Sequence, residues 1–255
     1  MRKKPKALDL FCCDGGASMG LQRAGFDVTG VDINPHPRYP FRFIQADALA
    51  VDLDGYDFIW ASPPCQAFSA LRHLHPKERP NLIPETRSRL VGSGAAYCIE
   101  NVEGAPLGSS GFLIMLCGTM FGLETKCGRA ELRRHRLFET SFSIPLRPAC
   151  QHGYVPSLSV AGSPQGSNYG RRRATLTVTG TGLDDNAMRN RRAISVTGST
   201  AQTNTVRNEK REVFTVEQAR EAMGIDWMSM KGLSQAIPPA YSEFIGRQFL
   251  SGRAL

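Results

Sequence analysis

The thiol of Cys65 is the side chain whose surroundings in the sequence most clearly predict chemistry. It follows Pro63-Pro64 at the end of an apolar run, and the two prolines restrict the loop backbone and so the direction of the next side chain. A cysteine becomes a strong nucleophile once it is deprotonated. Glu100 follows another apolar run, and a carboxyl group beside a thiolate can activate an electron-poor ring while sulfur adds to it. These residue types predict nucleophilic catalysis.

A second set of polar residues also follows apolar runs, and its composition suits a bound nucleoside. Asp14-Gly15-Gly16 comes after the first run, where a glycine turn lets backbone N–H groups approach a negatively charged group of a ligand. Asp32 follows the second run, where an acid can accept both ribose hydroxyls. Asp47 follows the third run and can accept an adenine amino group. No lysine follows the glycines, which excludes a nucleoside-triphosphate loop.

The apolar runs that precede these residues predict an α/β protein. We expect helices over 17–24 and 85–97 and strands over 7–12, 26–33, 41–44, 56–61 and 97–102. This alternation favours a doubly wound, mainly parallel sheet, in which ligands bind at the carboxyl ends of the strands. Near the end, Thr215 and Gln218 form a capping-box pair for a helix that Gly224 closes, and Pro238-Pro239 opens a last amphipathic helix.

Between residues 157 and 211 the sequence repeats itself three times with a constant offset of 18. The aligned segments are Ser157–Gly162, Thr175–Gly180 and Ala193–Gly198. One such unit buries too little apolar surface to be stable alone, so we expect the three units to stack. Stacking predicts an apolar column of Leu158, Leu176 and Ile194, a second column of Val160, Val178 and Val196, and one edge carrying Arg171, Arg189 and Arg207.

Composition and charge limit the class of protein. A chain of 255 residues that is 41% hydrophobic and 21% charged is typical of a soluble globular protein, and no run approaches the roughly 20 apolar residues that span a bilayer. No signal peptide is expected, which predicts a cytoplasmic protein with reduced cysteines. Lys and Arg outnumber Asp and Glu by 31 to 23, and the repeat segment is the most basic part, which suits a polyanionic partner.

Taken in order, these motifs resemble those of the cytosine-C5 DNA methyltransferases, and the short chain resembles compact phage-type members. The matching segments cover nearly the whole chain, and the most specific are Pro64-Cys65-Gln66 and Glu100-Asn101-Val102. The others are Asp9-Leu10-Phe11 with Gly15-Gly16, Arg134-His135-Arg136, Phe214 to Asp226, and Ala236-Ile237-Pro238-Pro239. The sequence departs from the family pattern at Cys13, Leu132 and Ser234-Gln235.

The resemblance implies a methyltransferase-type α/β fold with a small β-rich target-recognition lobe. Residues 1–140 and 233–255 would form the catalytic and cofactor-binding domain, and residues 141–232 the recognition domain with its three repeats. S-adenosylmethionine would be the cofactor and double-stranded DNA the partner of a monomer in a bacterial or phage-infected cell. Implied catalytic residues are Cys65, Glu100, Arg134 and Arg136. Implied cofactor-binding residues are Phe11, Gly15, Gly16, Asp32, Ile33, Asp47, Ala48, Pro64 and Gln235. Implied DNA-binding residues are Gln66, Ser69, Arg171, Arg189 and Arg207.

Four other interpretations stay open at this stage. An RNA cytosine methyltransferase would share the chemistry of Cys65 and Glu100, and a catalytically silent DNA-binding relative would share the fold. An amino-group methyltransferase would carry an aromatic residue where Cys65 stands. A zinc module could draw on Cys117, Cys127, Cys150 and His152. Because no Cys-x-x-Cys pair is present, we predict no metal site.

Overall fold

The computed structural model describes most of the chain and brings its two ends together in one α/β unit. The described residues are 3–68, 80–126, 130–145, 148–150, 174–177, 194–197, 200–202 and 215–253. None of the helices among them is long and apolar enough to cross a membrane.

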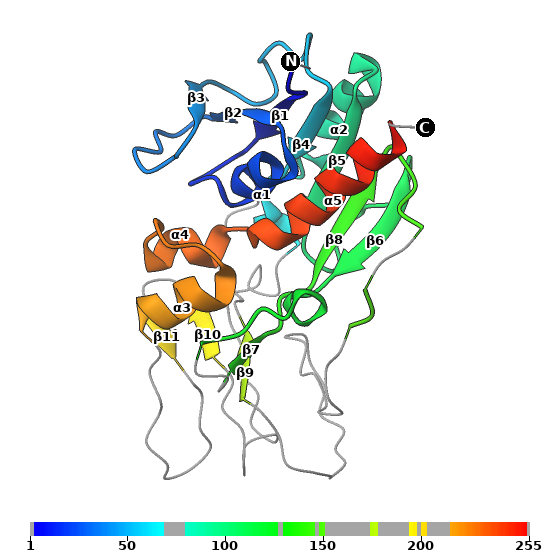
Figure 1. The fold of residues 1–255 in the computed structure, drawn as a ribbon. Coiled ribbons are helices and arrows are strands. Elements are labelled where there is room, and N and C mark those ends of the chain that lie inside the picture. The colour runs from blue at the N-terminus through cyan, green and yellow to red at the C-terminus, as the bar shows by residue number, and fades with distance from the viewer. Residues whose placement is uncertain are drawn as a thin grey trace.

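A seven-stranded sheet forms the centre of the molecule, with the strand order β3-β2-β1-β4-β5-β8-β6 (Figure 1). The first five strands of this order pair in parallel, and β8 and β6 add two antiparallel strands at one edge. The predicted mainly parallel sheet is confirmed. The strands are β1 (Lys6–Leu10), β2 (Asp27–Asp32), β3 (Arg42–Gln45), β4 (Phe58–Ala61), β5 (Ala96–Asn101), β6 (Phe112–Leu116) and β8 (Arg136–Thr140).

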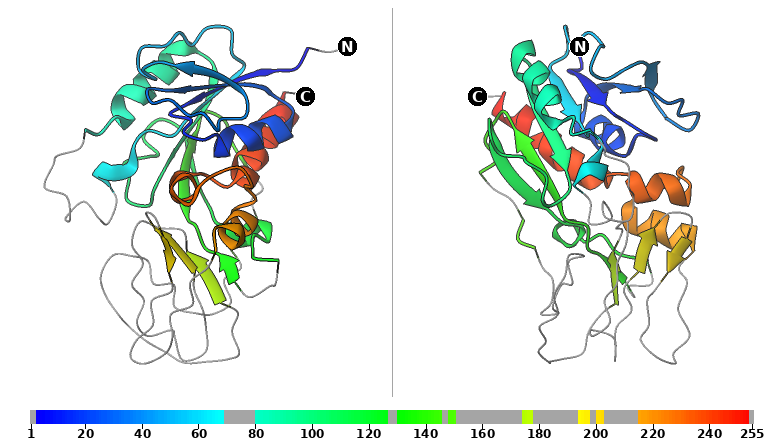
Figure 2. Two further views of the ribbon diagram at one scale, coloured as in Figure 1. Left: turned by 90° about the vertical axis from the view of Figure 1, so that its left-hand side faces the viewer. Right: turned by 180° about the vertical axis from the view of Figure 1, so that it is seen from behind.

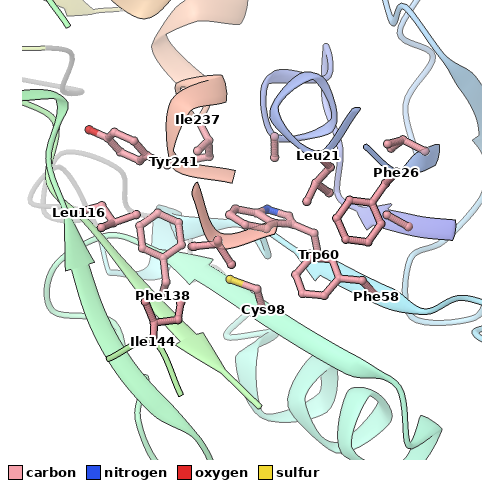
Figure 3. Close-up of a cluster of buried hydrophobic side chains, with 14 of the residues drawn as sticks. Leu21, Phe26, Phe58, Trp60, Cys98, Leu116, Phe138, Ile144, Ile237 and Tyr241 are labelled. Atoms are coloured by element: carbon pink, nitrogen blue, oxygen red, sulfur yellow. The ribbon is translucent and has the colours of Figure 1, made fainter. Parts of the chain in front are cut away.

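Helices cover both faces of this sheet, as a doubly wound fold requires (Figures 1 and 2). On one face α1 (Gly16–Ala24) and α5 (Pro239–Gly252) pack over Phe58, Trp60 and Phe138, which Figure 3 shows in the middle of the larger core. On the other face Leu90 of α2 (Ile83–Ser93) packs against β1 and β4. Both cores include apolar runs that predicted strands, and the larger core also contains Ile114 and Leu116 of β6 and Phe138 of β8, which were not predicted.

The first and last helices are packed unusually closely. A Cβ atom on Gly20 of α1 would lie 2.0 Å from the carbonyl oxygen of Pro239, so only glycine fits there. The Ser242 hydroxyl, on α5, donates to the carbonyl oxygen of Ala17 at 2.8 Å. The amino-terminal and carboxy-terminal parts of the chain therefore pack directly against each other.

A second, four-stranded sheet lies below the main one in Figure 1 and has the order β11-β10-β9-β7. Leu176 in β9 pairs in parallel with Ile194 in β10, and these residues are 18 positions apart, which is the offset of the sequence repeat. The first repeat lies outside the described residues. The strands are β7 (Ala130–Leu132), β9 (Ala174–Thr177), β10 (Ile194–Thr197) and β11 (Thr200–Gln202).

Two short helices, α3 (Val216–Met223) and α4 (Met230–Gln235), lie between the two sheets. The predicted capping box at the start of α3 is confirmed: the Thr215 hydroxyl accepts the N–H of Gln218, and the Gln218 side chain accepts the N–H of Thr215. Gly224 closes the helix in the left-handed conformation, as predicted.

The helix expected over 85–97 is wrong in its last part. It ends at Ser93, because Gly94 adopts a left-handed conformation with φ 68°, which terminates the helix. Strand β5 then begins at Ala96, so that Tyr97 lies in the sheet.

Candidate active site

Cys65 stands on a short loop that the neighbouring strand holds in place. Strand β4 ends at Ala61, and Cys65 opens a single 3-10 turn that runs to Ala67. The buried amide of Asn101, at the end of β5, donates to the carbonyl oxygen of Pro63 at 2.9 Å. The loop is thus tied to the adjacent strand two residues before the thiol, which fixes where Sγ lies.

Glu100 lies at the end of β5 beside this loop. The register pairs Ala61 with Ile99, which brings Glu100 next to Ser62. Its side chain is only 8% exposed, and burial raises the pKa of the carboxyl group, while Arg136 and a hydrogen bond from the Ser62 hydroxyl act in the opposite direction. A carboxyl group with a raised pKa can hold a proton and donate it to a ring nitrogen.

Two arginines complete the cluster. Arg136, the first residue of β8, places Nε 3.3 Å from Oε1 of Glu100. Arg134 is 1% exposed and donates to the carbonyl oxygen of Ser234 at 3.1 Å, and its own carbonyl oxygen accepts the hydroxyl of Tyr241 at 2.6 Å. Burial and the charge of Arg136 lower the pKa of Arg134 to about 9, so its guanidinium stays charged at neutral pH.

The charges around Cys65 couple the thiol to Glu100. Burial raises the pKa of the Cys65 thiol, and the negative charge of Glu100 raises it further, whereas Arg136 and Arg134 lower it. When Glu100 is protonated, the repulsion disappears and both arginines still attract the thiolate. The four residues can therefore hold one negative charge on sulfur while the carboxyl group keeps its proton.

The loop after β1 turns sharply along the same edge of the sheet. Phe11 and Cys13 have positive φ angles of 59° and 46°, and Gly15 has 86°. Left-handed conformations cost non-glycine residues energy, and such strain is concentrated at binding sites. A Cβ on Gly15 would touch the ring of Tyr39 at 3.0 Å, so the loop packs tightly against the chain beyond β2.

Asp32 ends β2 and ties this loop to the strand. Its Oδ2 accepts the N–H of Cys13 at 3.1 Å, and its Oδ1 accepts the N–H of Asn34 at 2.9 Å. His36 also faces it, with Nε2 3.5 Å from Oδ1. The next residue, Ile33, is 65% exposed and presents an apolar surface beside the carboxylate.

Asp47 and Ala48 follow β3 at the same edge. Asp47 is exposed, and its Oδ1 accepts the N–H of Leu49 at 2.9 Å; Ala48 is buried below it. The N–H of Ala46 donates to the carbonyl oxygen of Asp32 at 3.0 Å, which joins this turn to the end of β2. Carboxylates alternating with an exposed apolar side chain fit a nucleoside, with acids toward hydroxyl or amino groups and Ile33 toward a ring face.

Elements from the end of the chain pack against this edge. The indole N–H of Trp227 donates to the carbonyl oxygen of Asp14 at 2.8 Å. A Cβ on Gly16 would lie 2.5 Å from the carbonyl oxygen of Ile237, so backbone meets backbone there. Gln235 is exposed at the end of α4, and Pro64 is half-buried next to Cys65. The structure thus brings residues from both ends of the chain to one edge.

The predicted DNA-binding residues are described only in part. Gln66 is exposed in the turn that starts at Cys65. Ser69, Arg171, Arg189 and Arg207 lie outside the described residues. One contribution was missed from the sequence: Tyr241, whose hydroxyl donates to the carbonyl oxygen of Arg134.

No protein-family model matches the sequence, and no curated protein matches it. Several solved structures share its fold across nearly the whole chain, and three of them are described here. A protein described as a DNA modification methyltransferase, encoded within a prophage (E. coli), has a TM-score of 0.60 at 15% identity and covers 98% of this chain and 100% of its own. The S. pombe Dnmt2 methyltransferase has a TM-score of 0.55 at 15% identity, and the match covers 99% of this chain and 100% of its own. The methyltransferase EhMeth of Entamoeba histolytica has a TM-score of 0.53 at 9% identity, and the match covers 99% of this chain and 99% of its own. These likenesses confirm the predicted methyltransferase-type fold.

Proposed function

We propose that the chain is a DNA cytosine-C5 methyltransferase that uses S-adenosylmethionine and attacks its target base with Cys65. The observation that carries this proposal is the cluster of Cys65 with two arginines and a buried Glu100, whose pKa is raised by burial. A thiol, an acid and two cations at adjacent strand ends suit addition to a pyrimidine ring better than any other chemistry of these side chains. The fold shared with the methyltransferase structures supports the same conclusion.

In the proposed reaction the target cytosine leaves the duplex and enters the site, because its ring is unreachable while stacked. The Cys65 thiolate forms a bond to C6 while Glu100 donates its proton to N3, which makes C5 nucleophilic. S-adenosylmethionine would supply an electrophilic methyl group to C5, and its sulfonium would leave as the neutral thioether of S-adenosylhomocysteine. A water molecule then takes the proton on C5, the bond between sulfur and C6 breaks, and N3 returns its proton to Glu100, so that the aromatic base and the thiolate are restored.

The surrounding residues have positioning roles in this scheme. Arg136 lies against Glu100 and orients its carboxyl group, and its guanidinium suits the O2 oxygen of cytosine as a hydrogen-bond donor. Asn101 donates to the Pro63 carbonyl oxygen, and this hydrogen bond positions the Cys65 loop relative to the strand ends. Arg134 is held by Ser234 and Tyr241 and supplies fixed positive charge beside the thiolate.

The cofactor in this proposal occupies the carboxyl ends of β1, β2 and β3. Asp32 would accept from the ribose hydroxyls, Ile33 would pack against the adenine, and Asp47 would accept from its amino group. Phe11, Gly15, Gly16, Ala48, Pro64 and Gln235 would contact the rest of the cofactor. The loop strain at Phe11 and the exposed apolar surface of Ile33 fit this occupant.

DNA is favoured over RNA by the basic repeat segment. The proposed recognition domain, 141–232, holds nine Lys and Arg against three Asp and Glu between residues 157 and 211. Parallel pairing of β9 and β10 with an offset of 18 supports stacking of at least two repeats, which would align Arg189 and Arg207. Phosphate contacts from such an array add affinity for any duplex, and an arginine that reads a base edge adds specificity.

The product identifies the reaction. The chain is expressed in a host that lacks DNA methylation, and its genomic DNA and tRNA are analysed separately by nucleoside mass spectrometry, followed by bisulfite sequencing. We expect 5-methylcytosine in DNA within one sequence context. Methylation confined to tRNA would overturn the choice of DNA, and N4-methylcytosine or N6-methyladenine would overturn the mechanism.

The nucleophile is tested separately with a duplex that carries 5-fluorocytosine in the identified context. The fluorine cannot leave as a proton does, so the protein should stay covalently attached to DNA when the cofactor is present. Cys65→Ser should abolish the adduct. Cys98→Ala is the matched control, because this second thiol lies on β5, two residues before Glu100, and is fully buried. An adduct that survives Cys65→Ser would refute the assignment.

A further inference from the structure

We propose that Cys117, His135 and Cys150 form a zinc site that fixes the segment carrying the paired arginines. Their ligand atoms lie within 4.8 Å of one another, although the residues come from three separate parts of the chain. Thiolate and imidazole are the ligands that Zn²⁺ prefers in proteins. This site is not part of the Cys65 cluster, and the proposed methyl transfer does not require it.

The fold places the three ligands around one point. Strands β6 and β8 are antiparallel with Leu116 opposite Arg136, so the next residues outward, Cys117 and His135, face each other beyond the last pair. The side chain of Cys117 hydrogen-bonds that of His135. Cys150 reaches the same ring from a segment beyond β8, and its Sγ lies 3.5 Å from Nε2 of His135.

These distances agree with tetrahedral zinc. With Zn–S of about 2.3 Å and Zn–N of about 2.0 Å, a tetrahedral ion holds its sulfur and nitrogen ligands about 3.5 Å apart. The separation of Cys150 Sγ and His135 Nε2 already has this value. The hydroxyl of Thr119 lies 3.4 Å from Sγ of Cys117 and 3.7 Å from Sγ of Cys150, where it can donate to either thiolate. Three protein ligands leave the fourth position for a further donor.

Groups around the ligands have the arrangement that a zinc site needs. Glu103 places Oε2 3.7 Å from Nδ1 of His135, on the side of the ring opposite Cys150. A carboxylate near this nitrogen favours the tautomer that carries its proton on Nδ1 and presents the Nε2 lone pair to the metal.

The site has a consequence for the proposed active site, because His135 stands between Arg134 and Arg136. His135 faces the sulfur atoms, and its two neighbours face Glu100 and Cys65. A metal bound to His135 would restrain the backbone between Arg134 and Arg136, and so the positions of both guanidinium groups. Zinc would then act as a structural brace for the catalytic charges without touching the substrate.

Metal content tests the proposal directly. The untagged protein is purified from zinc-supplemented cells without chelator, and we expect about one zinc per chain, the content of a single structural site. Cys150→Ser and His135→Gln should each lose most of the metal, whereas Cys98→Ala should retain it. X-ray absorption at the zinc edge of the unaltered protein should show sulfur and nitrogen neighbours, which requires no variant to fold.

A second measurement follows the brace itself. Removal of zinc by a chelator should accelerate amide hydrogen exchange across β8, from Arg136 onward, and should leave exchange in β1 and β2 unchanged. The proposal fails if the purified protein holds no zinc and also takes up none when it is titrated in reduced form. It also fails if zinc is bound by oxygen ligands alone, if Cys150→Ser retains it fully, or if Cys117 and Cys150 form a disulfide in protein handled without oxygen.

Discussion

Replacing Asp9 by asparagine should make the protein more stable above neutral pH. Asp9 lies on β1 and is 1% exposed; its Oδ2 accepts the hydroxyl of Ser18, and its Oδ1 has no hydrogen-bond partner among the described residues. Ser18 in turn shares a hydrogen bond with the hydroxyl of Tyr39 at 2.7 Å. Burial is the main cause that raises the pKa of Asp9 from 3.8 to about 7.

The size and sign of the effect follow from this shift. A raised pKa means that the folded protein binds a proton more tightly than the unfolded chain, so stability is lost as the pH rises from about 4 to about 7. A shift of about three pKa units corresponds to about 4 kcal/mol in total. Between about pH 5 and about pH 8 the loss should be about 2–3 kcal/mol, or roughly 5–10 °C in Tm for a domain of this size. The variant Asp9→Asn has no carboxyl group to ionise at this position and should not show this loss of stability.

Urea denaturation across this pH range, followed by tryptophan fluorescence, measures the difference. The gap in free energy of unfolding between Asp9→Asn and the unaltered protein should widen steadily in favour of the variant as the pH rises. Asp27→Asn provides the control, because Asp27 is an exposed carboxylate at the start of β2, and its pH profile should match that of the unaltered protein. Parallel profiles for the unaltered protein and Asp9→Asn would refute the reasoning.

Two further predictions concern single side chains. Asp32→Ala should weaken S-adenosylmethionine binding by roughly ten- to a hundredfold, because hydrogen bonds to a charged acceptor contribute about 1.5–3 kcal/mol; unchanged affinity in calorimetry would reject the ribose contact. Arg87→Ala should destabilise the fold by about 3–5 kcal/mol, because Glu139 is completely buried and Arg87 donates to both its oxygens at 2.8 and 2.9 Å. Part of this loss should return in the double variant with Glu139→Gln, and equal denaturation midpoints for all three proteins would contradict the prediction.

The parallel half of the fold could be predicted from the sequence because its pattern is local. Each buried strand is a short apolar run, and each is followed by a helix or turn with its own start and stop residues. Because elements that are consecutive in the sequence usually lie side by side, the fold class can be inferred from this alternation. Strands β6 and β8 were missed for the same reason. They pair in antiparallel fashion at the sheet edge without a helical crossover, and the alternation that identified the other strands is absent there.

The candidate site divides in the same way. Cys65, Glu100, Arg134 and Arg136 were predicted from motifs, and the structure brings them together, while their catalytic roles remain proposals. The part played by Tyr241 depends on contacts across more than a hundred positions, which no local pattern reveals. The zinc ligands illustrate the limit most clearly: Cys117 and Cys150 were considered, but His135 joins them only through the register of two strands that had not been predicted.

The close packing of α1 against α5 also constrains how the chain can be synthesised and folded. Strands β1, β2, β4 and β5 can pair as soon as they leave the ribosome, but the apolar face beneath α1 stays uncovered until Tyr241 and Ile245 have been made. The turn at Gly16 likewise meets its backbone neighbour, Ile237, only at that late stage. Contacts between residues more than 200 positions apart are slow to form, and the incompletely folded chain exposes an apolar surface that is prone to aggregation. The edge of the sheet that we propose binds the cofactor is therefore among the last parts of the nascent protein to be completed.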